Sequence, residues 1–158
     1  MVFSDVTLFT KISAFLVLSA VVLDIVSLAT PHWENGTLFD SGLWEICKEA
    51  LSVRSCSSIP EDVISDKFQT VRAFVIIGCV LGLLTFLLLI MFIFKHTANR
   101  VKNVVILLAG LAGICTLIGF CVYTSLADSY GYSFILNVVA GALYFVVTII
   151  MALDQRIC

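Results

Sequence analysis

Long apolar segments alternate with short polar ones along this chain. The apolar segments are close to the length of about 20 residues that crosses roughly 30 Å of hydrocarbon, and they cover residues 12–30, 73–94, 104–124 and 134–153. Because almost everything else is short connection, the pattern predicts a single membrane domain over 1–158, an all-α bundle of four transmembrane helices. The predicted connections are 31–72, 95–103 and 125–133.

The first apolar segment could also be a secretory signal peptide, because Ser27-Leu28-Ala29 offers small residues near a cleavage point. However, the segment is long for the apolar part of a signal peptide, and Asp24 interrupts it. Lys11 also follows a polar stretch rather than opening the chain. We therefore expect the segment to stay in the protein as a helix.

Basic residues near the helix ends predict the orientation in the membrane. They are dense in the connection 95–103 and at the two chain ends: Lys11, Lys95, Arg100, Lys102 and Arg156. They are sparse in 31–72, which holds Lys48, Arg54, Lys67 and Arg72, and absent from 125–133. This asymmetry predicts a multi-pass plasma-membrane protein with both termini in the cytoplasm and the long first loop outside.

The composition agrees with the membrane class. Of 158 residues, 61% are hydrophobic and 13% charged, and the mean hydropathy is +1.12, whereas soluble domains carry about 25% charged residues. The net charge of −2 and the lack of a basic stripe argue against nucleic acid as a partner. The lipid bilayer is the partner that the composition implies.

The cysteines divide by compartment. Cys47 and Cys56 lie in the outward loop, where conditions are oxidising, and we expect a disulfide worth about 2–3 kcal/mol. Those inside the apolar segments are expected to be packing residues: Cys79, Cys115 and Cys121. Cys158 follows the fourth segment, and S-palmitoylation and an unmodified thiol are both open there.

The first loop mixes strand-like and turn-like sequence. Strands are predicted over 43–47 and 51–56 with a turn near 49–50, and further turns over 35–36 and 40–42. We expect a small antiparallel β-sheet on the outer end of the bundle. Trp33 and Trp44 are then either its core and its membrane anchor, or a binding surface. Asn35-Gly36-Thr37 is a glycosylation sequon, so Asn35 is a candidate glycan site.

Together these residues resemble the first extracellular loop of the claudin, epithelial membrane protein and peripheral myelin protein superfamily. The pattern is carried by Trp33, Gly42-Leu43-Trp44, Cys47 and Cys56. Weaker similarities are the arginine-bearing start of the second span, with Arg72, the aromatic start of the fourth, 131–136, and the acidic position Asp24. The short spacing between Trp33 and Gly42 is closer to the epithelial membrane and peripheral myelin proteins than to barrier-forming claudins.

Small and polar residues within the spans are candidates for helix contacts. Gly78 with Gly82, and Ala109 with Gly113, have the spacing at which small residues let helices approach, either within one chain or in a homodimer. Asp24 lies deep in the first span, and we expect it to bond to Asn137, Tyr123 or Thr124, with partner docking as the alternative.

The sequence disfavours catalysis. His32 and His96 are predicted on opposite sides of the membrane, and the chain lacks CxxC, HExxH and GxSxG motifs. No cofactor, metal site or catalytic residue is therefore predicted, and the spans lack the polar stripe of a channel.

The resemblance implies a junctional or adhesive protein that organises cell–cell contacts and self-associates in cis or in trans. An auxiliary subunit of an ion channel or receptor in the same membrane is the alternative.

Overall fold

The computed structural model describes residues 7–36, 39–50, 53–60, 64–95, 99–127 and 129–157. Within these ranges the chain forms four long helices, α1 (Leu8–Ala29), α2 (Asp66–Lys95), α3 (Asn99–Thr124) and α4 (Tyr132–Ile157). All four are long and apolar enough to cross a membrane. The predicted fold class is confirmed, and Cys158 lies outside the described residues.

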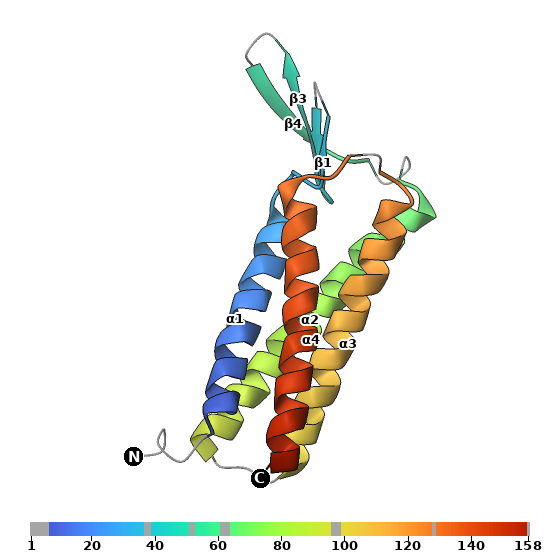
Figure 1. The fold of residues 1–158 in the computed structure, drawn as a ribbon. Coiled ribbons are helices and arrows are strands. Elements are labelled where there is room, and N and C mark those ends of the chain that lie inside the picture. The colour runs from blue at the N-terminus through green and yellow to red at the C-terminus, as the bar shows by residue number, and fades with distance from the viewer. Residues whose placement is uncertain are drawn as a thin grey trace.

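The helices form a bundle with a small sheet at one end (Figure 1). α1 packs on α2 and α4, and α3 packs on α2 and α4. α1 begins and α4 ends at the end of the bundle away from the sheet (Figure 1). The chain therefore crosses the bundle as an up-and-down series. All four helices begin earlier than the apolar segments that predicted them, and α2 and α4 also end later, because the polar residues at these ends continue the same hydrogen-bond ladder.

The sheet has four antiparallel strands in the order β1-β2-β3-β4. Their bounds are Glu34–Asn35, Phe39–Ser41, Glu45–Ala50 and Val53–Ser58. Cys47 pairs directly with Cys56 across β3 and β4, and a disulfide joins them. The predicted disulfide and antiparallel sheet are thus both present.

The strand boundaries differ from the predicted ones. Leu43 and Trp44 precede β3 instead of opening it, and residues 49–50 belong to β3 rather than to a turn. Asp40 and Ser41, expected in a turn, form β2, which leaves Gly42 at the bend. The physical reason is tertiary: Leu43 is fully buried and the Trp44 indole bonds to α1, so this segment follows the bundle instead of the sheet.

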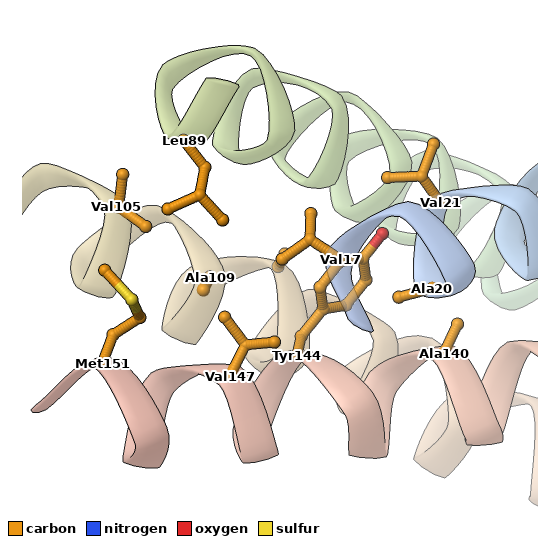
Figure 2. Packing of buried hydrophobic residues seen from close by; sticks show 11 residues of the cluster. Val17, Ala20, Val21, Leu89, Val105, Ala109, Ala140, Tyr144, Val147 and Met151 are labelled. Carbon is orange, nitrogen blue, oxygen red and sulfur yellow. The ribbon is translucent and has the colours of Figure 1, made fainter. Parts of the chain in front are cut away.

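One buried cluster, shown in Figure 2, joins all four helices and extends along α4 from Ala140 to Met151. Val17, Ala20, Ala109, Ala140 and Val147 have no exposed side-chain surface. In α1 the buried residues recur at three- and four-residue spacing, as a single helix face requires. A second cluster lies below the sheet around Trp33 and Leu43.

Small residues set the distance between helices. A Cβ atom on Gly82 of α2 would overlap the Tyr144 hydroxyl of α4, and one on Gly78 would lie 3.1 Å from the Thr116 methyl of α3. Ala109 is fully buried, and a Cβ on Gly113 would lie 3.0 Å from the Phe145 ring. These contacts join helices of the same chain.

Replacing Gly82 by alanine should therefore destabilise the bundle. The new methyl group would displace Tyr144, and overpacking of this kind costs about 1–3 kcal/mol. Gly110→Ala is the matched control, because its Cβ would meet only Thr148 atoms at 3.8 Å, an ordinary contact. Thermal unfolding in detergent should show a lower midpoint for Gly82→Ala alone; equal midpoints for both variants would contradict this packing account.

Candidate functional site at the sheet–bundle junction

The junction between sheet and bundle is built on the last turn of α1. The final carbonyl groups of a helix have no donor within the helix, and in a membrane each unsatisfied group is expensive. Here the Val26 carbonyl accepts from the Thr30 backbone N–H at 3.1 Å and from its hydroxyl at 2.7 Å. The next two carbonyls are satisfied by side chains from the loop.

Those side chains are the two tryptophans. The Trp33 indole Nε1 donates to the Ser27 carbonyl at 2.8 Å, and the Trp44 indole Nε1 donates to the Leu28 carbonyl at 3.0 Å. The tryptophans therefore cap α1 and tie the sheet to it. Because indole has a single N–H donor and no acceptor nitrogen, it suits a carbonyl at an apolar boundary.

The rings of the two tryptophans have different surroundings. Trp33 is only 1% exposed, with its ring 5.0 Å from that of Tyr123 and 5.9 Å from that of Phe134. Trp44 is 44% exposed. Trp33 thus lies in the core below the sheet, whereas one part of Trp44 faces the surroundings of the bundle.

Arg72 closes the other side of the junction. From the second turn of α2 its Nε donates to the Leu43 carbonyl at 2.6 Å. Its guanidinium carbon lies 4.8 Å from the Trp44 ring centre and 5.1 Å from that of Phe68. Arginine over an aromatic face is attracted by the ring quadrupole. Arg72 therefore fixes Trp44 and the adjoining bend of the loop to α2.

The loop also binds the start of α4. The Gly131 N–H donates to the Trp33 carbonyl at 2.8 Å, and the Ser133 N–H donates to the His32 carbonyl at 3.1 Å. A Cβ on Gly131 would overlap the His32 carbonyl oxygen, so only glycine allows this approach. The loop residues next to Trp33 are held at both α1 and α4.

Side chains reinforce that contact. The His32 ring stacks on Tyr132 with centres 4.7 Å apart, its Nδ1 lies 3.0 Å from the Tyr132 hydroxyl, and its Nε2 lies 3.5 Å from the Asp40 carboxylate. Sequence reasoning placed His32 in the outer loop without a partner. His32 bridges β2 and α4 because it contacts both Asp40 and Tyr132. Tyr132 lies 100 residues further along the chain, so the local sequence gives no signal for this contact.

Asn35 lies on β1 with an exposed side chain, and its backbone carbonyl accepts from the Ser129 hydroxyl at 3.0 Å. Thr37 of the sequon lies outside the described residues. Glycosylation of Asn35 therefore stays a prediction.

The Glu45 carboxylate lies close to Cys47 and Cys56, but those sulfurs are bonded to each other and offer no thiolate to a metal ion.

Deeper in the bundle, Asp24 joins α1 to α4. One carboxylate oxygen accepts from the Asn137 amide at 3.0 Å, and the other accepts from the Tyr144 hydroxyl at 2.9 Å. Asp24 is fully buried. Of the three partners expected for it, Asn137 is found; Tyr123 packs instead on Trp33, and the Thr124 hydroxyl donates to its own helix at the Cys121 carbonyl.

Tyr144 is the partner that sequence reasoning missed. It lies two helical turns after Asn137, so both side chains project from the same face of α4. A polar pair at that spacing inside an apolar segment was the available signal.

A second buried polar contact lies at the end of the bundle away from the sheet. The Lys102 ammonium donates to the Asp154 carboxylate at 2.8 Å, and the Thr10 hydroxyl donates to the same oxygen at 3.4 Å. Asp154 is 1% exposed and Lys102 is 8% exposed. Three helices, α1, α3 and α4, meet in this contact, which sequence reasoning missed because both charges lie near predicted helix ends.

One comparison with known proteins adds to this geometry. The sequence model of the PMP-22/EMP/MP20/Claudin family matches residues 6–151, which include the tryptophans, the disulfide, the first three helices and most of α4. A search of curated proteins found no match.

The bond between Asp24 and Tyr144 can be measured by a double-mutant cycle. We expect Asp24→Val and Tyr144→Phe each to destabilise the protein, with a coupling of about 0.6–1.7 kcal/mol, between the average and the maximum for hydrogen bonds between membrane helices. The measurement is the free energy of unfolding in mixed micelles for both single variants and the double variant. Strictly additive effects would contradict a direct interaction between the two side chains.

Proposed function

The chain belongs to the PMP-22/EMP/MP20/Claudin family, and on this premise we propose that it organises cell–cell contacts or apposed membranes as a structural, adhesive membrane protein. In this proposal the sheet faces outward at the plasma membrane, both termini are cytoplasmic, and the protein self-associates in cis and in trans. The basic residues away from the sheet, including Lys11 and Arg100, support that orientation.

Aromatic side chains support the same placement in the membrane. Trp44, Tyr130 and Tyr132 all lie where the helices meet the sheet, and each is between 44% and 47% exposed. Tryptophan and tyrosine concentrate at the level of the lipid headgroups. With these rings at the headgroup level, the sheet stands in the aqueous space beyond the membrane.

The observation that carries the proposal is a pair of exposed apolar side chains toward the far end of this sheet. The β3–β4 hairpin extends away from the helices (Figure 1). Val53 is 66% exposed and Phe39 is 42% exposed, and both lie toward the far end of the sheet, because Val53 pairs with Ala50 and Phe39 with Lys48. Apolar side chains held out in water favour contact with another surface.

The disulfide supports this use of the hairpin. A two-stranded hairpin is marginally stable by itself, and the Cys47–Cys56 bond joins its strands midway. The far end is therefore presented as a fixed surface. Such a surface loses less conformational freedom on binding than a flexible loop would.

Mixed cultures test the proposal. Cells that express a tagged copy are grown together with cells that lack the protein, and we expect signal to concentrate at borders between two expressing cells. Val53→Asp should abolish this enrichment by placing a charge in the contact. Ser57→Asp is the matched control, because it adds the same charge to the same strand, opposite Ile46 and nearer the bundle.

Equal wild-type signal at expressing–expressing and expressing–null borders would contradict contact between copies in trans. Loss of enrichment in both variants would show that the charge, and not its position at the far end, is responsible. Surface labelling of intact cells confirms that each variant reaches the plasma membrane in comparable amounts.

A further inference from the structure

A crevice of about 190 Å³ opens on the side of the bundle between α3 and α4. Its floor is made by Gly113, Thr116 and Gly141, which are all buried. Neither glycine has a side chain, and the Phe145 ring crosses close above Gly113. The two glycines therefore let the Phe145 ring and the Thr116 side chain of the facing helix approach closely along this seam.

The floor has little polar character. The one polar side chain in it, that of Thr116, turns its hydroxyl back into its own helix and donates to the Gly113 carbonyl at 2.8 Å and the Ala112 carbonyl at 3.2 Å. A Cβ on Gly141 would overlap that hydroxyl. The Thr116 hydroxyl hydrogen is thus already donated within α3 and is not available to an occupant of the crevice.

The walls are apolar and reach the outer surface of the helices. Leu117 of α3 is 49% exposed and Val138 of α4 is 37% exposed, and Ala142 is also exposed. Phe120 and Phe145 complete the lining. Because these residues belong to membrane-spanning helices, the crevice opens into hydrocarbon and not into water.

The depth of the crevice places it in one leaflet. Val138 and Phe145 lie about 9 Å and about 20 Å along α4 from Tyr132, where the helix begins. A leaflet contributes about half of the roughly 30 Å of hydrocarbon. With Tyr132 at the headgroup level, about 5–7 Å outside the hydrocarbon, the crevice therefore runs along the chains of the leaflet on the sheet side and reaches the midplane.

We propose that this crevice binds the acyl chain of a membrane phospholipid from the leaflet on the sheet side. Most sites for compact drug-sized ligands have about 300–1,000 Å³, so this one is small for a fused-ring ligand and suits part of a flexible chain. An empty crevice would forfeit the dispersion contacts of its lining. Acyl chains are the molecules that hydrocarbon supplies at that depth, and a flexible chain adapts to an irregular gap.

Photolabelling in lipid nanodiscs tests this site directly. The probe is a phosphatidylcholine with a diazirine in the inner half of one acyl chain, and adducts are mapped by mass spectrometry. We expect several-fold more adduct at Leu117 and Val138 than at Ile114 and Val139, which lie at similar depths and are 46% and 43% exposed but lie outside the crevice.

Two variants keep the test specific. Ala142→Phe fills the crevice from an exposed position, so it should remove the excess of adducts without loss of folded protein. Val146→Phe is the control, since Val146 is 42% exposed on the same helix but does not line the crevice. It should leave the excess of adducts unchanged.

Adducts spread evenly over all exposed positions would overturn the proposal. It would also be overturned if the crevice gave no adduct while the protein behaved as a dimer that Ala142→Phe dissociates, because a helix of a second copy would then occupy the crevice. Neither outcome would affect the adhesive function proposed above, which is tested at cell borders.

Discussion

The end of the first helix imposes the constraint on which the rest of this structure depends. The last carbonyl groups of α1 need hydrogen-bond donors near the membrane boundary, where unsatisfied backbone groups are expensive. Trp33 and Trp44 supply those donors from a loop that returns over the bundle. One pair of bonds therefore completes the helix and seats the sheet. The contacts of Arg72 and of Gly131 then hold the same loop against α2 and α4.

Polar contacts at two further depths connect the helices in the same manner. Asp24 bonds to two donors of α4 in the half of the bundle nearer the sheet, and Lys102 pairs with Asp154 near the opposite end. Between them most buried side chains are apolar (Figure 2), with Ser13 and Thr85 as buried polar exceptions. Since the hydrophobic effect does not drive helices together within lipid, such bonds and the close approach at glycines select which helices become neighbours. Because the loop is bonded to α1, α2 and α4, the arrangement of these helices also fixes the position of the sheet.

The sequence predicted those parts of the structure that local chemistry decides. The length of each apolar segment predicts a spanning helix. In lipid the backbone must satisfy its own hydrogen bonds, and only helices and closed barrels do so. The expected position of Cys47 and Cys56 in an oxidising compartment predicted their pairing in the same way. The start of β3 was misplaced because Leu43 is buried below the sheet and Trp44 bonds to α1, contacts that local sequence does not report.

Tertiary partners were predicted less well for the same reason. Asn137 could be chosen as the partner of Asp24 because it is a polar amide inside an apolar segment. Tyr144 was overlooked because tyrosine in such a segment is equally typical of packing. The Lys102–Asp154 pair was hidden because charges near helix ends are commonly assigned to the membrane surface. The pair is buried in the folded bundle, where Thr10 of α1 donates a hydrogen bond to the Asp154 carboxylate.

The most direct measurement replaces the indole N–H of Trp33, and separately of Trp44, while keeping the ring. Benzothienylalanine has nearly the same shape, with sulfur in place of the N–H group. If the tryptophans cap α1, replacement at Trp33, whose bond is buried, should lower the free energy of unfolding in mixed micelles by about 1–3 kcal/mol, the penalty of an unpaired buried acceptor. Replacement at Trp44, whose bond is exposed, should lower it by less. Unchanged stability at both positions would mean that the rings act by packing alone, and the capping account would be wrong.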